Sequence, residues 1–221
     1  MFNLSSDKIQ FAIVFLIALI LSIAVHEFGH AFVADKLGDR LPRMQGRVTL
    51  NPVAHIDVIG TIVMPLMIVF TGAPLLGWGK PVQTNPAAYT RRLRMKTGHM
   101  IVAAAGPTMN MLLALVVSIV FVAYLKIAHE PNREILKNVA MLIQLNIGLM
   151  FFNLIPLPPL DGGTVLRGFI PDQHQDKLDF LDRYGGFILL ALLFTGGLGI
   201  VMRPVGTVIA SWLDLLVRVA T

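Results

Sequence analysis

The sequence predicts an all-α, polytopic membrane protein, and three observations lead to that class. Hydrophobic residues make up 55% of the 221 residues and charged residues only 14%, whereas a soluble domain usually carries about 25% charged residues. Apolar runs recur along the chain, several of them as long as the roughly 20 residues that a helix needs to cross a bilayer. Cysteine is absent, which excludes a thiol nucleophile, a cysteine-ligated metal site and a disulfide framework.

We expect five to six hydrophobic segments, joined by polar connectors, within a single membrane-embedded domain over residues 1–221. The segments are 9–34, 58–76, 99–125, 138–159, 185–202 and a weaker one at 204–219. The formal charge of +5 gathers in short connectors between apolar segments, where basic residues normally mark the cytoplasmic face. The charge therefore does not require nucleic acid as a partner.

Three polar groups fall within about one turn of the first apolar segment. His26, Glu27 and His30 form the pattern His-Glu-x-x-His, which places two imidazoles on one helical face within reach of one metal ion. Ionisable groups inside a membrane helix indicate a functional site, because each costs about 3 kcal/mol in lipid. A glutamate beside the metal can take a proton from a water molecule that attacks a carbonyl. The pattern predicts a zinc site, with a hydrogen-bonded His–Glu cluster as the alternative.

A third ligand is expected elsewhere, because catalytic zinc usually has three protein ligands and a water molecule. Asp161 is the strongest candidate. It directly follows a long apolar segment, among prolines that break a helix and glycines that let the backbone approach closely. Asp57 is the second candidate, and a solvent-facing aspartate at a helix end is the alternative for Asp161. His26, Glu27, His30 and Asp161 would converge on one site, which predicts one zinc ion per chain.

Several ordered motifs resemble those of the site-2 protease family, in particular its short members without a PDZ domain. The motifs lie at 26–30, 51–57, 77–82, 105–110 and 153–163. The resemblance implies a zinc metalloendopeptidase that hydrolyses peptide bonds within or near the membrane. It implies His26, His30 and Asp161 as metal ligands and Glu27 as the base. The implied partners are a transmembrane protein substrate and membrane lipid.

The resemblance also implies that Asn110 and Asn153 line the substrate site. An amide side chain near the metal can bind an extended substrate backbone or a developing oxyanion. Asn153, eight residues before Asp161, is the better candidate for the backbone contact. Interhelical hydrogen bonding is the alternative for both amides, as it is for Asn146. For His55, oxyanion stabilisation and a plain loop histidine at the membrane interface are equally open.

We expect segment 58–76 to enter the membrane and return rather than cross it. Both connectors that flank it are basic, and the zinc ligands meet Asn110 only if the helix ends that carry them share one membrane side. Gly60, Pro65 and Gly72 interrupt the segment, and non-helical backbone at membrane depth is tolerated where protein covers it. An ordinary transmembrane helix is the alternative, because about 19 mostly apolar residues are long enough to span.

Two other functions would use the same residues. A membrane metal transporter would use His26, Glu27, His30 and Asp161 as transport ligands, whereas an inactive scaffold descended from a protease would keep only the fold. The complete ligand set argues against the scaffold. We expect a multi-pass protein of a bacterial or archaeal plasma membrane. The sequence leaves the substrate and a homo-oligomer open.

Overall fold

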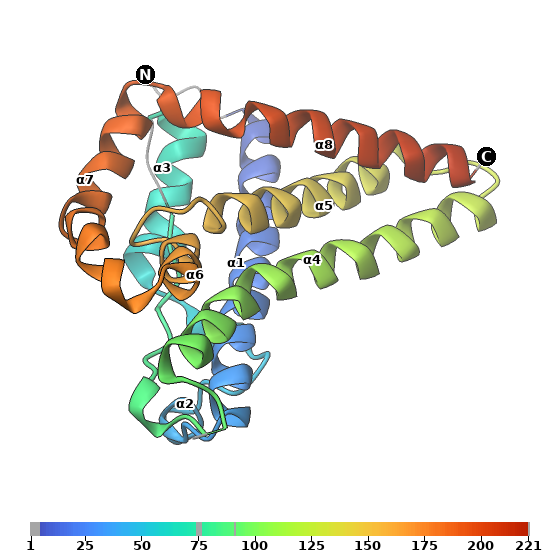
Figure 1. Ribbon diagram of the computed structural model, residues 1–221. Helices are drawn as coiled ribbons and strands as arrows, with labels where there is room; N and C mark the ends of the chain where they lie inside the picture. The colour runs from blue at the N-terminus through green and yellow to red at the C-terminus, as the bar shows by residue number, and fades with distance from the viewer. Residues whose placement is uncertain (1–4, 74–76, 91, 221) are drawn as a thin grey trace.

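The computed structural model describes residues 5–73, 77–90 and 92–220, and Figure 1 shows its helices. The α-helices are α1 (Ser6–Lys36), α2 (Leu41–Met44), α3 (Met64–Thr71), α4 (Met95–Ile127), α5 (Arg133–Asn153), α6 (Asp161–Phe169), α7 (Asp179–Phe194) and α8 (Gly197–Ala220). A π-helical turn, Val58–Val63, leads into α3, and 3₁₀ turns cover Pro52–His55, Pro86–Ala88 and Asp172–Leu178. Positions 74–76 of the predicted segment 58–76 lie outside the described residues.

The prediction of an all-α, polytopic membrane protein is confirmed. Among the described residues, four helices are long and apolar enough to cross a membrane, namely α1, α4, α5 and α8. No β-strand occurs in the described ranges. The helical part of the second apolar segment, Val58–Thr71, is shorter than these four. At 1.5 Å per residue it is about 21 Å long, less than the roughly 30 Å of a hydrocarbon core.

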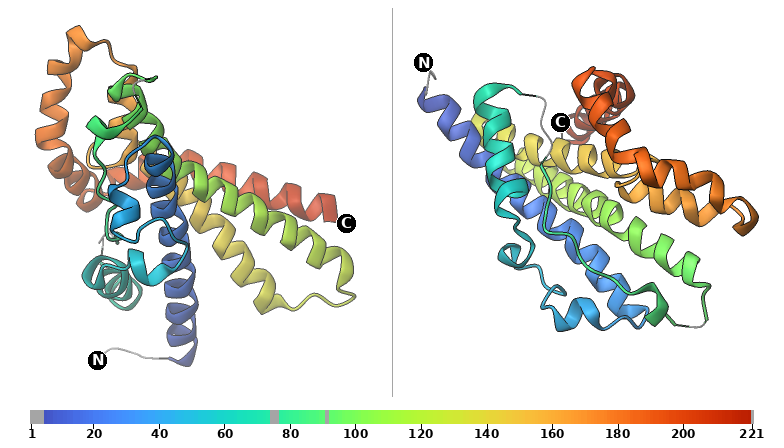
Figure 2. Two further views of the ribbon diagram at one scale, coloured as in Figure 1. Left: turned by 90° about the horizontal axis from the view of Figure 1, so that it is seen from below. Right: turned by 90° about the vertical axis from the view of Figure 1, so that its left-hand side faces the viewer.

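Helix α4 lies at the centre of the fold, since α1, α5, α6 and α8 all pack against it (Figure 2). Helices do not gain from hiding apolar surface from lipid, so close packing of their side chains and backbones holds them together. The cluster where α4, α5 and α8 meet consists of Ala114, Phe121, Ile143, Ile147 and Val205. At the crossing of α1 and α4, Gly29 faces the carbonyl group of Ala105, where a Cβ atom would lie only 2.7 Å from the oxygen. This glycine lets the two helices approach closely.

Two predicted boundaries near the C-terminus are wrong. The fourth apolar segment is helical only to Asn153 rather than to 159, because the prolines that follow cannot continue a helix. The last two apolar segments divide at Gly196, not at position 203. Gly196 has φ of 76°, a conformation that glycine adopts without steric cost. Pro204 lies inside α8, as prolines do in membrane helices whose neighbours compensate for the lost hydrogen bond.

The two connectors that flank Val58–Thr71 lie side by side. Gln45 Nε2 donates to Gln83 Oε1 at 2.8 Å, and the backbone N–H of Asn85 donates to the carboxylate of Asp39 at 2.5 Å. Segments that bond to each other share one side of the membrane. These contacts and the short helix support the re-entrant arrangement, which stays a prediction.

Cysteine labelling of intact membranes checks the arrangement, and the chain contains no natural cysteine that would interfere. We expect Gln45→Cys and Gln83→Cys to react with an impermeant maleimide from the same side. His129→Cys, in the loop between α4 and α5, serves as the control and should react from the opposite side, because α4 is long enough to span. Labelling of positions 45 and 83 from opposite sides would show that Val58–Thr71 crosses the bilayer.

Candidate metal centre

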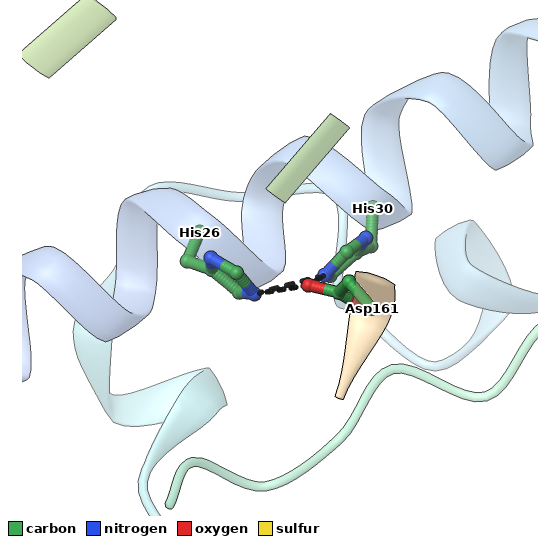
Figure 3. Close-up of side chains that lie close together, drawn as sticks. All are labelled: His26, His30 and Asp161. Carbon is green, nitrogen blue, oxygen red and sulfur yellow. Dashed lines mark hydrogen bonds and ion pairs between the residues drawn. The ribbon is translucent and has the colours of Figure 1, made fainter. Parts of the chain in front are cut away.

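His26 and His30 lie one turn apart on α1, and their imidazole rings converge (Figure 3). The Nε2 atoms of the two rings are 3.0 Å apart. On the other side of the rings, Nδ1 of His26 lies 2.6 Å from Asn110 Oδ1, and Nδ1 of His30 lies 2.8 Å from the carbonyl oxygen of Val102. Both partners are acceptors, so each neutral ring carries its proton on Nδ1. Each Nε2 atom therefore presents a lone pair.

Asp161 adds a third donor from the first turn of α6. Its Oδ2 atom lies 3.1 Å from His26 Nε2 and 3.4 Å from His30 Nε2, and Figure 3 shows the carboxylate between the two rings. This oxygen is buried and accepts no hydrogen bond from the part of the chain that the structure describes. Lone pairs that face one another repel unless a cation lies between them. The three residues therefore form a group that could hold a metal ion.

The backbone that brings Asp161 to α1 is shaped by its neighbours in sequence. Helix α5 ends at Asn153, and the chain then turns so that Gly162 lies against the carbonyl group of Leu154. A Cβ atom at Gly162 would clash with that carbonyl group. The glycine thus allows the first turn of α6 to pack on the end of α5, and this packing directs the carboxylate toward α1.

The spacing and surroundings of the three donors fit zinc. Tetrahedral zinc with bonds of about 2.0–2.1 Å places its ligand atoms about 3.3 Å apart, and the separations here are 3.0, 3.1 and 3.4 Å. Gly106 of α4 keeps the volume beside both Nε2 atoms free, because a Cβ atom there would clash with both rings. His26, His30 and Asp161 would hold the ion, which polarises a carbonyl group and acidifies a water molecule.

Glu27 lies beside the donors without being one of them. Its Oε2 atom accepts a hydrogen bond from the backbone N–H of Val82 at 3.0 Å, and the ligand atoms that converge within 4.8 Å belong to the other three residues. The carboxylate lines the same cavity as the donors, which has a volume of about 510 Å³. The carboxylate is thus held by a backbone donor, lies beside the three converging donors and is open to the cavity.

An extended strap, residues 77–85, forms one wall of the cavity and supplies the N–H of Val82. The N–H of Lys80 donates to the carbonyl oxygen of His55 at 2.9 Å, and the buried guanidinium of Arg47 donates to the carbonyl oxygen of Lys80. Sequence reasoning gave no role to Arg47 or Val82. Their contacts use backbone groups of a distant segment, for which the sequence carries no signal.

The two predicted substrate-binding amides occupy different places. Asn153 lines the cavity, and its Nδ2 donates to the carbonyl oxygen of Leu149 at 3.0 Å. Asn110 is fully buried and contacts His26 instead of the cavity. Asn153 thus lies at the cavity wall, whereas Asn110 lies against the ring of His26. The expectation that Asn110 lines the substrate site is corrected accordingly.

His55 and Asp57 have structural partners in the connector after α1. His55 is 1% exposed, and its Nε2 donates to the carbonyl oxygen of Thr49 at 2.9 Å. Burial lowers the pKa of His55 below its ordinary value, which keeps the ring neutral. It is not among the cavity-lining residues, so the role of a plain loop histidine fits better than oxyanion stabilisation. Asp57 accepts a hydrogen bond from the N–H of Gly60 at 2.8 Å and caps the π-helical turn.

Comparisons with known proteins agree with this geometry. The sequence model of Peptidase family M50 matches residues 14–129 and 122–193. The Bacillus subtilis protein named "Putative zinc metalloprotease YwhC" is 35% identical over 191 residues, which cover 83% of this chain and 80% of that protein. The Rip2 protein of Mycolicibacterium smegmatis, also named as a putative zinc metalloprotease, is 31% identical over 180 residues, 81% of this chain and 66% of that protein.

A more distant relative is the archaeal "Zinc metalloprotease MJ0392" of Methanocaldococcus jannaschii. It is 24% identical over 172 residues, which cover 78% of this chain and 38% of that protein. No solved structure matches the chain at a significant level. The family match includes α1 and α6, which carry the three donors, and it ends before α8. The chain belongs to Peptidase family M50, the site-2 proteases, and is a zinc metalloprotease of that type.

Proposed function

We propose that the protein is an intramembrane protease that hydrolyses peptide bonds of transmembrane or membrane-adjacent substrates, as in regulated intramembrane proteolysis. In this proposal His26, His30 and Asp161 bind one zinc ion per chain, and Glu27 is the general base. The convergence of the three donors carries the proposal, because two of them lie on α1, a helix that is long enough to span a membrane. The proposed location is the plasma membrane of a bacterium or archaeon, in contact with lipid.

The position of the donors along α1 supports hydrolysis inside the membrane. His26 lies ten residues before the last residue of α1, Lys36, which corresponds to about 15 Å along the helix axis. A hydrocarbon core is about 30 Å thick, so a site at this position lies near its middle when α1 spans with the charged Lys36 at the edge of the core. Water reaches such a site only through the protein, and the cavity of about 510 Å³ beside Glu27 offers the space.

The residues divide the chemistry between them. Glu27 would accept a proton from the attacking water molecule as the water oxygen bonds to the carbonyl carbon, and would then pass this proton to the amide nitrogen, whose bond to that carbon breaks to release the amine. Its bond from Val82 directs the carboxylate toward the cavity. The Oδ1 atom of Asn153 accepts no hydrogen bond from the described residues, so the amide is free to bind substrate backbone.

A substrate helix must unwind before its peptide bonds can be attacked, because its amides are hydrogen-bonded within the helix. The strap at 77–85 offers an extended partner for the unwound segment. The N–H groups of Trp78 and Lys80 bond to the carbonyl groups of Gly60 and His55. Gly79, between them, points its backbone groups the other way, and it is among the cavity-lining residues. Pairing with an exposed backbone edge is a general mode of peptide recognition.

Cleavage of a single-pass membrane protein, followed by mass spectrometry of the products, tests the proposed function. We expect the cut to fall within the apolar segment, and we expect glycine or proline near that point to speed cleavage. The matched substrate replaces these residues by leucine and should be cut slowly. An enzyme that cleaves soluble peptides and leaves every membrane-embedded bond intact would contradict the proposal.

Zinc analysis tests the ligand assignment separately. Purified protein should hold about one zinc ion per chain. Asp161→Asn removes the anionic donor and should weaken zinc binding by at least about 100-fold, since even outer-shell changes cost 10- to 100-fold. Asp57→Asn is the matched control and should bind zinc like the wild type, because Asp57 caps the turn at Val58–Val63. Unchanged zinc affinity and activity in Asp161→Asn would exclude Asp161 as the third ligand.

A further inference from the structure

A buried polar network joins α1, α4 and α5 beside His26. It comprises Ser22, Asn110 and Asn146, each 0% exposed, and is called the amide network below. Asn110 Oδ1 lies 2.6 Å from His26 Nδ1, and Asn110 Nδ2 donates to Asn146 Oδ1 at 2.8 Å. Asn146 Nδ2 in turn donates to Ser22 Oγ at 2.9 Å. The network thus connects Asn146 of α5, through Asn110 of α4, to the predicted metal ligand His26 on α1.

Further acceptors fix the direction of every bond in the amide network. The hydroxyl of Ser22 donates to a carbonyl oxygen one turn earlier in α1 at 2.7 Å, so its lone pairs face Asn146. Asn146 Nδ2 also donates to a carbonyl oxygen of its own helix at 2.9 Å, and Asn110 Nδ2 also donates to the carbonyl oxygen of Ser22 at 3.1 Å. With both NH₂ groups facing acceptors, the Oδ1 atom of Asn110 must point to His26.

We propose that Asn146 and Ser22 are positioning residues of the metal site, which fix the orientation of the Asn110 amide and, through it, the tautomer of His26. This inference rests on the proposed role of His26 as a zinc ligand. An amide that orients a ligand histidine acts as an outer-shell partner, and such partners set the tautomer and the ring orientation. Asn146 and Ser22 extend that shell by two further residues.

The alternative orientation of Asn110 shows why its partners matter. The two ends of an amide have nearly the same shape, so only its hydrogen bonds decide which end faces His26. With the NH₂ group toward His26, Nδ1 would become the acceptor and the proton would move to Nε2. An N–H group would then point at the position between His30 and Asp161 where a cation belongs. The amide network excludes this state, because a flipped Asn110 would set its oxygen against Asn146 Oδ1 and the Ser22 carbonyl oxygen.

Two substitutions at Asn146 test the inference through zinc affinity, measured by competition with a chelator. Asn146→Leu keeps the size but removes the acceptor for Asn110, and we expect zinc to bind about tenfold more weakly, at the low end of outer-shell effects. Asn146→Asp should restore most of the affinity, because a carboxyl group buried among neutral partners without a cation stays protonated and keeps one acceptor and one donor. Wild-type affinity in the leucine variant, or equal loss in both variants, would overturn the proposal.

Two serines provide a matched pair that keeps the test valid if changes at Asn146 prevent folding. The hydroxyls of Ser22 and Ser118 each donate to a carbonyl oxygen one turn earlier at 2.7 Å. Each accepts a hydrogen bond from a side chain of another helix, from Asn146 at 2.9 Å and from Trp212 at 3.0 Å. Ser22→Ala should weaken zinc binding several-fold and Ser118→Ala should not, although both lose a similar packing contact. Equal effects of the two changes on zinc affinity would mean that the amide network only joins helices.

The tautomer itself can be observed in metal-free protein labelled with ¹⁵N-histidine. The His26 signal, identified by its absence in His26→Asn, should show a protonated Nδ1 and a bare Nε2 in the wild type. In Asn146→Leu the two tautomers should both be populated, whereas an unchanged wild-type pattern would contradict the proposal. This readout uses neither substrate nor metal. The positioning role of Asn146 and Ser22 can therefore be confirmed even if the protein shows no protease activity. It can also be refuted even if the protein is an active protease.

Discussion

Glu27→Gln is expected to lower peptide hydrolysis by about 10²- to 10⁴-fold, the usual contribution of a general base, while the zinc content stays at the wild-type level. Glutamine has the size of glutamate, and its carbonyl oxygen can still accept the hydrogen bond from Val82 that Glu27 Oε2 accepts at 3.0 Å. The side chain therefore stays in place. The amide cannot take up a proton, so only the base is removed.

Co-expression with a single-pass membrane substrate gives the activity, and metal analysis of the same purified variant gives the zinc content. Glu134→Gln, in the exposed first turn of α5, is the control for loss of a carboxylate and should leave both readouts unchanged. Loss of zinc together with activity in Glu27→Gln would indicate that Glu27 is a ligand, as in a metal transporter. Full activity of the Glu27→Gln variant would exclude Glu27 as the general base.

The metal donors could be predicted because their geometry is local. Two histidines four residues apart share a helical face in any α-helix, so the spacing of His26 and His30 already places two imidazoles together. Asp161 is distant in sequence, but prolines and glycines next to it mark a turn that aims a carboxylate at a packed site. The structure brings its Oδ2 atom to 3.1 and 3.4 Å from the two Nε2 atoms.

The surroundings of the donors could not be predicted, because they depend on how helices cross. The sequence around Asn110 is compatible both with a substrate-binding amide and with an interhelical hydrogen bond. Only the crossing of α1 with α4 places this amide against His26. The same holds for Val82, whose contact with Glu27 uses a backbone N–H that every residue other than proline possesses. The boundary between the last two apolar segments differed for another reason, since the chain turns at Gly196, whereas Pro204 lies within α8.

Gly106→Ala is expected to weaken zinc binding by at least about 100-fold, more than the 10- to 100-fold cost of a typical outer-shell change. Elsewhere in a helix, replacing glycine by alanine usually stabilises by about 0.5–1 kcal/mol. At Gly106 the added methyl group would clash with Nε2 of both His26 and His30. The rings cannot simply turn away, because Nδ1 of each is held, by Asn110 at 2.6 Å and by Val102 at 2.8 Å.

Gly148→Ala is the matched control, since a methyl group at this position meets no described atom within 4 Å beyond its chain neighbours and the backbone of its own helix. It should keep wild-type zinc affinity and gain slightly in thermal stability, as expected for alanine in a helix. Both variants should show the helix content of the wild type by circular dichroism, so that a difference in zinc affinity reports on the site alone. Zinc bound by Gly106→Ala with wild-type affinity would mean that the ion does not occupy the space between the two rings beside α4, and the three-donor site would have to be abandoned.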